Sequence, residues 1–167
     1  MPPPETAIGQ LAKAIARLEA NPLPASLNEP IRAMYSAIGP YMPLKERLVL
    51  ANLWLFEPLL IKQMEKNRVT NAAIRTTTAA TIFRAGVKEN VLPQAALATV
   101  NFRIAPGESS ESVIAHVRRV INDPHIVIRE AGAIKSEPTS VSSPAGWGFR
   151  QVKDAILQVR PDLVVAP

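Results

Sequence analysis

Cysteine is absent from the 167-residue sequence, so disulfide bonds, thiolate metal sites and a cysteine nucleophile are excluded. Histidine is scarce as well, with His116 and His125 as its two copies. A centre that binds two metal ions needs several His, Asp or Glu ligands converging on each ion, so two histidines are too few. Paired carboxylates, a nucleophile elbow and a glycine-rich phosphate loop are also missing. We therefore expect this sequence by itself to be inert.

The surroundings of the two histidines favour structural roles. His116 lies beside an apolar helical stripe, where a structural side chain is the simpler interpretation. His125 follows Asp123-Pro124 in an expected turn, and an Asp two positions before a His is a possible metal pair. Because no second ligand cluster accompanies this pair, metal binding there is disfavoured.

A long uninterrupted hydrophobic run is lacking too. The most apolar stretch, residues 48–64, is broken by Glu57-Pro58 and by Lys62, and it falls short of the run of about 20 apolar residues that a bilayer span needs. Residues 1–20 carry a charged amphipathic pattern without the apolar core of a signal peptide. We expect a soluble protein without a membrane span, and its compartment is not specified.

Positive charge exceeds negative charge but is not concentrated. The 19 Lys and Arg against 14 Asp and Glu give a net charge of +5. These residues are spread along the chain, which is typical of a solvated basic surface. With 47% hydrophobic residues, a chain of this length can bury one ordinary core, so one domain with an appendage is expected.

Helical patterns fill the N-terminal part of the chain. An apolar stripe over residues 8–18 predicts an amphipathic helix that stops at Asn21-Pro22. The stretch from Pro24 to Pro43 contains four prolines and predicts short helices separated by turns. Residues 44–66 are rich in Leu, with Lys45, Glu46 and Arg47 at their start, and predict a helix that is bent or split at Pro58.

The periodicity then changes to that of β-strands. Residues 74–83 are mostly Thr, Ile, Phe and Ala and predict a strand, closed by Gly86. Residues 96–104 alternate strictly, which places Arg103 on the face opposite the apolar set. The two strands are expected to pair antiparallel. A helix capped by Ser109 or Ser110 follows, with an apolar stripe formed by Val113, Ile114, Val117, Val120 and Ile121.

The end of the chain adds two further elements. Residues 126–130 alternate and predict a short strand, and residues 149–159 predict a final helix after a connection rich in Ser, Pro and Gly. The order of elements predicts an α+β fold, a split βαβ sandwich that lacks its first strand. Such a sheet has an open edge. Another segment supplies the missing strand, a second copy pairs with the edge, or the edge stays open.

Three stretches carry a resemblance to a known family. They are Met1–Gly9, Thr76–Gly86, and the Asn-Val-Leu-Pro of residues 90–93 leading to Asn101–Ile104. Gly86, this tetrapeptide, Arg103 and Pro106-Gly107 stand in the order typical of the lid domain of dinuclear-zinc metallopeptidases. The chain resembles, over nearly its whole length, the lid of the branch that contains aminoacylases and carboxypeptidase S. The insertion around residues 52–56 resembles the members that hydrolyse or form N-acyl amino acids.

The resemblance implies a ferredoxin-like two-layer sandwich, an antiparallel sheet with helices on one face, plus a helical insertion. It implies a fragment of a hydrolase whose absent catalytic domain binds two zinc ions, so no cofactor, metal ligand or catalytic residue is expected here. In this family the lid lends the active site an Asn and an Arg that hold the substrate, plus a His, often across the dimer. Asn90 and Arg103 occupy those positions as substrate-binding residues. A lid histidine that stabilises the oxyanion would precede Met1.

The same resemblance implies a domain organisation and partners. Residues 1–135 are expected to form the lid or dimerisation domain, with the helical insertion at about 25–68, and residues 136–167 a linker and helix leading back to the catalytic domain. The expected partners are that catalytic domain, a second copy bound through the sheet edge and a helix, and an N-acyl amino acid or short peptide. Nucleic acid is not expected.

The chemistry of the two site residues agrees with these roles but leaves alternatives. The planar guanidinium of Arg103 can donate two parallel hydrogen bonds to a carboxylate, although a surface salt bridge would also explain it. Asn90 offers a donor and an acceptor for a carbonyl or amide, although Asn is common in turns for structural reasons.

Two other functions remain open. A stand-alone ferredoxin-like module could bind RNA or a protein, but Phe83 and Phe102 are the aromatic residues of the predicted strands, without the matching RNA-binding signature. Residues 48–64, with Trp54 and Phe56, could bind a membrane surface or a partner. Packing on the domain itself, or covering an acyl-binding pocket in the larger enzyme, is the simpler interpretation.

Overall fold

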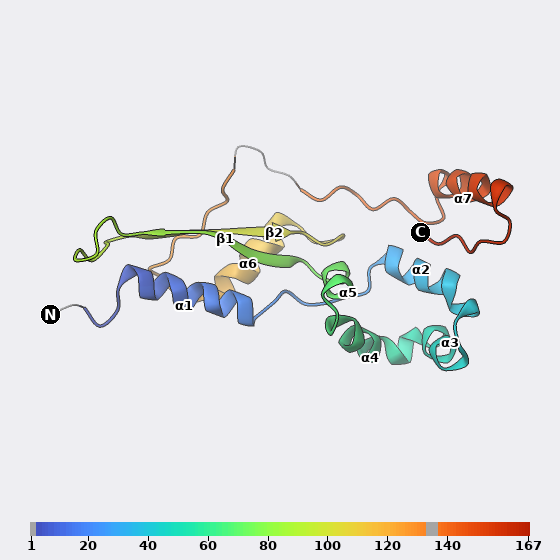
Figure 1. Ribbon diagram of the computed structural model, residues 1–167, viewed down its shortest axis with the longest axis horizontal. Coiled ribbons are helices and arrows are strands. Elements are labelled where there is room, and N and C mark those ends of the chain that lie inside the picture. Colours follow the sequence, from blue (N-terminus) through green and yellow to red (C-terminus); the bar gives the residue numbers. More distant parts are fainter. Residues whose placement is uncertain (1–2, 133–136) are drawn as a thin grey trace. The chain divides into compact units, whose positions relative to one another are not determined.

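The computed structural model describes residues 3–132 and 137–167, which divide into two compact units. Unit 1 comprises Met1–Pro24 and Arg75–Pro138, and unit 2 comprises Ala25–Ile74 and Thr139–Pro167. Figure 1 labels the helices and strands of both units. Each unit has its own cluster of buried apolar side chains.

Unit 1 contains two amphipathic helices, α1 (Ala7–Ala20) and α6 (Ser110–Ile121). The Thr6 hydroxyl starts α1 by accepting a hydrogen bond of 3.1 Å from the Gly9 N–H. Ser109 starts α6 through a capping box, in which its hydroxyl accepts from the Ser112 N–H and the Ser112 hydroxyl accepts from the Ser109 N–H. Both predicted helices, and the predicted cap at Ser109, are confirmed.

The sheet of unit 1 is an antiparallel hairpin of β1 (Thr77–Ala85) and β2 (Ala96–Arg103). The register runs from Thr77 opposite Arg103 to Ala85 opposite Ala96. It shifts between Ala80 and Ile82, a β-bulge that adds local twist to the hairpin. The predicted antiparallel pair is confirmed. The first strand begins at Thr77 rather than at residue 74, because Ile74 is buried in the core of unit 2.

The core of unit 1 lies between this sheet and the two helices. One face of β2 contributes the partly buried Val100 and Phe102, and Ile104 follows just after the strand. Fully burying one aliphatic side chain stabilises the fold by roughly 1.5–3 kcal/mol. Figure 1 shows α1 and α6 on the same side of the sheet, which is the α+β arrangement predicted from the sequence. The buried residues of this cluster are Ala14, Leu18, Leu23, Val113, Val117 and Ile121.

The segment after α6 differs from its prediction. Asn122 ends the helix in the left-handed region at φ 43°. Residues 126–130 keep the predicted alternation, since Ile126 and Ile128 pack against the core whereas Val127 is 78% exposed. However, these residues form no ladder within the described parts of the chain, so the predicted third strand is wrong as an assignment. The segment is packed like a strand but lacks a hydrogen-bonded neighbour.

Unit 2 is mostly helical. Its elements are α2 (Glu29–Ile38), the 3₁₀-helix η1 (Gly39–Tyr41), α3 (Leu44–Ala51), α4 (Leu53–Glu65), α5 (Arg68–Ala73) and α7 (Trp147–Val159). Leu27, Met64 and Ile74 form the buried cluster, and Tyr35 and Leu60 are among the side chains packed against it. The short helices around the prolines and the final helix were predicted and are confirmed.

The long helix predicted over residues 44–66 is split at Asn52 rather than at Pro58. Asn52 leaves the helical region (φ −120°, ψ 42°), and its side-chain amide donates a hydrogen bond of 2.8 Å to the carbonyl of Leu48. This bond satisfies a carbonyl at the end of α3, so the chain can turn there. Pro58 lies inside α4, which continues past it.

The inserted segment of unit 2, Ala25–Ile74, begins and ends at points that are hydrogen-bonded to each other. The backbone N–H of Ser26 donates a hydrogen bond of 2.8 Å to the carbonyl of Ile74. The segment thus begins and finishes at neighbouring points of the backbone. Within the described residues, no helix is long and apolar enough to cross a bilayer.

Candidate functional site

Arg103 is the last residue of β2 and faces away from the core. It is exposed, as is Asn101 on the same face, whereas Phe102 between them packs inward. Across the hairpin its register partner is Thr77, which offers no charge. Within the described parts of the chain, no salt bridge to its guanidinium occurs. The alternative of an internal salt bridge is therefore not realised in the described residues.

Asn90 lies in the loop that connects β1 to β2. The loop begins at Gly86, whose φ of 70° suits glycine, and it contains a turn in which the Val91 N–H donates to the Lys88 carbonyl at 3.3 Å. Asn90 is exposed in this turn. Its amide is thus available to a ligand, and the loop backbone sets its position.

Asn90 and Arg103 lie at opposite ends of the hairpin. β2 runs from Ala96, next to the loop, to Arg103. At about 3.3 Å per residue, this strand separates its two ends by roughly 23 Å. Figure 1 shows the loop extending beyond the sheet at the far end from the C-terminus of β2. The structure does not bring the two predicted substrate-binding residues together, so one copy cannot place both on one small molecule.

Both ring nitrogens of His116 are occupied within unit 1. Its Nε2 lies 2.9 Å from the backbone carbonyl of Asn21, so this nitrogen must carry the proton. Its Nδ1 lies 3.0 Å from an Nη of Arg119, which can only donate, so Nδ1 is the acceptor. The side chain is 8% exposed. It ties α6 to the end of α1 and has no free lone pair for a metal.

His125 takes part in a different arrangement, centred on Asp123. The carboxylate of Asp123 accepts from the backbone N–H of His125 at 3.0 Å and from the side-chain amide of Gln10 at 3.1 Å. These hydrogen bonds stabilise the charged form and hold the pKa of Asp123 below its ordinary value, with the His125 bond as the largest cause. Among the described residues, no group of three or more His, Cys, Asp and Glu side chains could hold a metal ion.

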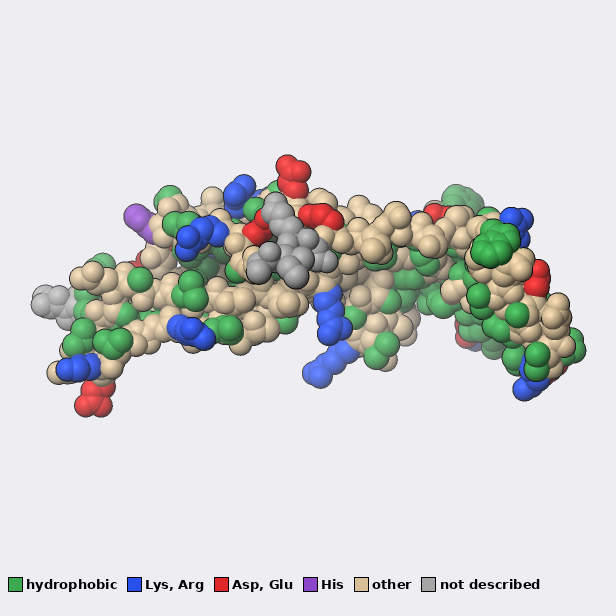
Figure 2. Space-filling view, turned by 90° about the horizontal axis from the view of Figure 1, so that it is seen from above, with side chains coloured by type: hydrophobic (Ala, Val, Ile, Leu, Met, Phe, Trp, Pro, Cys, Tyr) green, Lys and Arg blue, Asp and Glu red, His purple; other side chains and the backbone are tan. Residues whose placement is uncertain are grey.

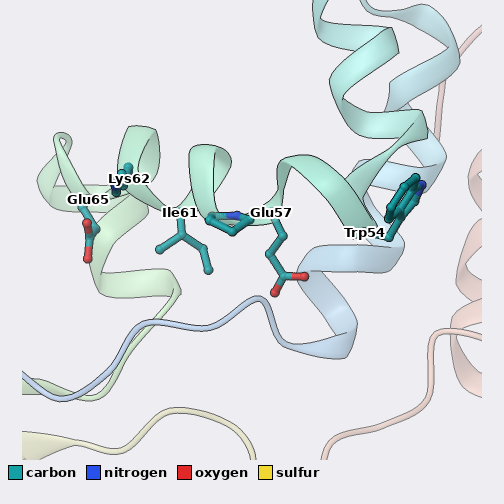
Figure 3. Close-up of a pocket in the computed structure, with 6 residues that line it drawn as sticks. Trp54, Glu57, Ile61, Lys62 and Glu65 are labelled. Carbon is teal, nitrogen blue, oxygen red and sulfur yellow. The ribbon is translucent and has the colours of Figure 1, made fainter.

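The α4 helix of unit 2 carries a shallow depression along one face. Figure 3 shows Glu57, Ile61 and Glu65 extending to the same side of the helix, with Trp54 at the other end. Trp54 is 81% exposed. Arg32 holds Glu57 through both carboxylate oxygens at 2.6 and 2.7 Å, so this carboxylate is already engaged. The face has no converging set of free polar groups of the kind that fixes a small ligand.

Lys and Arg side chains are scattered over the face that Figure 2 shows. Figure 2 shows Lys and Arg on the visible face as separate groups rather than as a continuous stripe. A nucleic-acid-binding domain is expected to gather these charges on one face.

A family model matches most of the chain. The family described as "Peptidase dimerisation domain" matches residues 3–127, and the chain belongs to this family. The match spans all of α1 to α6, including the helical insertion.

Two curated relatives contain a segment similar to this chain. The chain is 45% identical over its whole length to "Probable carboxypeptidase S-like 2" of Dictyostelium discoideum, of which it covers 32%. It is 39% identical, over 99% of its length, to the human "N-fatty-acyl-amino acid synthase/hydrolase PM20D1", of which it covers 34%. The chain thus spans about a third of the length of the curated relatives it matches. No solved structure matches it.

Proposed function

We propose that this chain is the dimerisation or lid domain of a zinc-dependent hydrolase that acts on an amide bond next to a free carboxylate. N-acyl amino acids and short peptides are the substrate classes. The observation that carries the proposal is the exposed guanidinium of Arg103, which has no salt-bridge partner in the described residues and stands in a domain whose relatives are named for such substrates. A guanidinium can hold a free carboxylate through two parallel hydrogen bonds.

The two zinc ions are assigned to the catalytic domain of the larger enzyme. Residues of this chain do not fit them, because the described part contains no cluster of three or more potential ligands and His116 has both nitrogens engaged. Bound zinc would supply an activated water and polarise the amide carbonyl. The role of this chain is to bind and orient the substrate, and alone it is expected to be inactive.

Asn90 is proposed to bind the substrate carbonyl or amide from a second copy of the domain. The roughly 23 Å length of β2 keeps Asn90 and Arg103 of one copy from reaching the same small substrate. A symmetric dimer, which the family description implies, offers each site an Arg103 from one copy and an Asn90 from the other. Each active site would then be shared between two subunits.

Mixed dimers test this arrangement. The full-length enzyme is prepared as Asn90→Ala and as Arg103→Ala, each impaired alone, and the two are mixed under conditions that exchange subunits. A mixed dimer then has one intact site and one doubly altered site. Random exchange makes half of the dimers mixed, so about a quarter of the wild-type rate of N-acyl amino acid hydrolysis should return.

The outcomes separate the parts of the proposal. If both variants are impaired but mixing restores nothing, sharing of the site between subunits is refuted. If neither substitution alters kcat or KM, the substrate roles of both residues are refuted. A 167-residue chain that hydrolyses the substrate without the rest of the enzyme would refute its assignment as a lid. A matched control is Asn101→Ala, an exposed position on the same face of β2.

A further inference from the structure

The proposed substrate contacts belong to unit 1, whereas unit 2 carries an exposed apolar surface that has no assigned role. It consists of five large side chains of α3 and α4, whose exposed fractions lie between 55% and 81%. They are Leu44, Leu48, Trp54, Leu55 and Leu59, which we call the α3–α4 surface. Within the described residues these side chains do not pack on the domain itself, the simpler interpretation of the sequence. We propose that the α3–α4 surface attaches the protein to the face of a membrane that contains negatively charged lipids.

The α3 part of the surface is an apolar row with basic residues on both sides. Leu44 and Leu48 are four positions apart and therefore lie on the same side of the helix. At about 3.6 residues per turn, Lys45 and Arg47 fall on either side of this row, whereas Glu46 falls on the opposite side of the helix. All five side chains are exposed. The apolar side of α3 is thus bordered by positive charge.

The α4 part of the surface changes from apolar to basic along one side of the helix. Leu55, Leu59, Lys62 and Lys66 follow one another at helical spacing and are all exposed. Trp54, at the start of α4 (Figure 3), is 81% exposed. A tryptophan ring has an apolar body and a polar N–H, which suits the boundary between lipid tails and headgroups. The lysine stems can lie along the apolar layer while their ammonium groups reach the headgroups.

Positive charge on this segment is not balanced by the described parts of the chain. Residues 41–68 contain five Lys and Arg against three Glu. One of the three, Glu57, is held by Arg32 through both carboxylate oxygens, which leaves two for the five basic side chains. Within the described residues, no salt bridge involves any of these five. Anionic headgroups would supply the complementary charge.

The mixture of residues favours a membrane over a protein partner. The buried centres of protein interfaces are depleted of lysine, yet Lys62 comes one turn after Leu59 on the same side of α4. Segments that lie in the membrane interface instead combine Trp and Leu with Lys and Arg. With 8 and 13 residues, α3 and α4 are shorter than the about 20 residues of a bilayer span, so they would lie along the interface.

Vesicle flotation of the full-length protein tests the proposal. The probes are vesicles of phosphatidylcholine, with and without phosphatidylserine. We expect binding to the mixed vesicles, weakened about tenfold or more by omitting phosphatidylserine or by raising the salt concentration, because both reduce the electrostatic attraction. Equal binding to both kinds of vesicle, or binding that is insensitive to salt, would overturn the charge requirement and with it the proposal.

Variants at exposed positions separate the two contributions. Leu55→Ser combined with Leu59→Ser should lower the partition coefficient about tenfold or more, because two apolar side chains no longer enter the lipid. Lys62→Gln combined with Lys66→Gln should lower binding to the mixed vesicles about tenfold and leave binding to phosphatidylcholine alone unchanged. The substituted side chains are exposed, so the midpoint of thermal unfolding should stay the same.

The second tryptophan of the chain provides a matched control. Trp147 begins α7, also in unit 2, and is 72% exposed. Trp54→Ala should weaken vesicle binding, whereas Trp147→Ala should not. The proposal is overturned if the full-length protein binds neither kind of vesicle, as when its other domain covers the α3–α4 surface, or if the two alanine variants bind equally well. Self-association that is lost in the double serine variant, without vesicle binding, would assign the surface to a protein contact instead. Because no activity is measured, the result is independent of the hydrolase assignment.

Discussion

The Nε2–H of His116 donates a 2.9 Å hydrogen bond to the carbonyl of Asn21, the residue that ends α1. His116→Ala removes this bond and leaves a carbonyl at the end of α1 and the Arg119 guanidinium without their partner. We expect a loss of roughly 1–3 kcal/mol in the free energy of unfolding, measured with urea. The exposed His125 provides the control, since His125→Ala should change stability by less than about 0.5 kcal/mol.

Asp123 should make stability depend on pH in the acid range. Its folded pKa lies below its unfolded value because His125 and Gln10 donate hydrogen bonds to the charged carboxylate. Its contribution is therefore fully present above the ordinary Asp pKa and is lost as pH falls through the folded value. Urea unfolding from about pH 5 downward should show a shallower decline for Asp123→Asn than for the wild type. Gln10→Ala should lie between them, and identical slopes for all three would contradict this account.

Asn122 adopts a left-handed conformation that favours glycine. At φ 43° an L side chain is strained, although Asn tolerates the region better than most residues. Asn122→Gly is expected to leave stability unchanged or to raise it slightly, whereas Asn122→Val should lower it by about 1–2 kcal/mol. The midpoints of thermal unfolding of the wild type and the two variants would give their order of stability. A valine variant as stable as the wild type would show that the helix end rearranges.

Leu18 is a test of the core between α1 and the sheet. It is 4% exposed, so Leu18→Ala should cost about 2–5 kcal/mol through lost burial and a residual cavity. Ile8 of the same helix is 41% exposed and provides a matched control, with a much smaller expected effect. The difference between the two variants can be measured from their denaturant midpoints, provided that the dependence of unfolding free energy on denaturant concentration is the same for both.

Activity of the full-length enzyme should depend on the planar geometry of the Arg103 guanidinium as well as on its positive charge. In the full-length enzyme, Arg103→Ala is expected to lower kcat/KM by about ten- to a hundredfold, the worth of a charged hydrogen bond. Arg103→Lys should recover part of that loss but not all, because an ammonium cannot form two parallel hydrogen bonds with a carboxylate. Full activity of the Arg103→Lys variant would show that the site requires a positive charge but not two parallel hydrogen bonds.

Local sequence patterns correctly predicted the elements in which core-facing apolar side chains recur at a regular spacing. The stripes of α1 and α6 and the alternation of β2 predicted the antiparallel hairpin and the helices that cover it. A cap at Ser109 or Ser110 was predicted for α6, and Ser109 provides it. The cap of α1 at Thr6 was not predicted.

Contacts outside the local pattern explain the errors. A helix bent or split at Pro58 was expected, but the split lies at Asn52, where a hydrogen bond to Leu48 ends α3, and α4 continues through the proline. The alternation of residues 126–130 does place Ile126 and Ile128 against the core, but a β-strand also requires a hydrogen-bonded neighbouring strand. The separation of Asn90 from Arg103 contradicts no prediction; it follows from strand length and loop direction, which a motif does not encode.

The hydrogen bond between Ser26 and Ile74 makes the inserted helices a modular attachment. Because they leave and rejoin the backbone at adjacent points, a short linker could bridge residues 26 and 74 without lengthening the path between α1 and β1. A segment with that geometry can be acquired, enlarged or lost during evolution while the hairpin and its covering helices stay intact. Residues 26 and 74 are therefore suitable boundaries for replacing this set of helices with the corresponding set from a related protein.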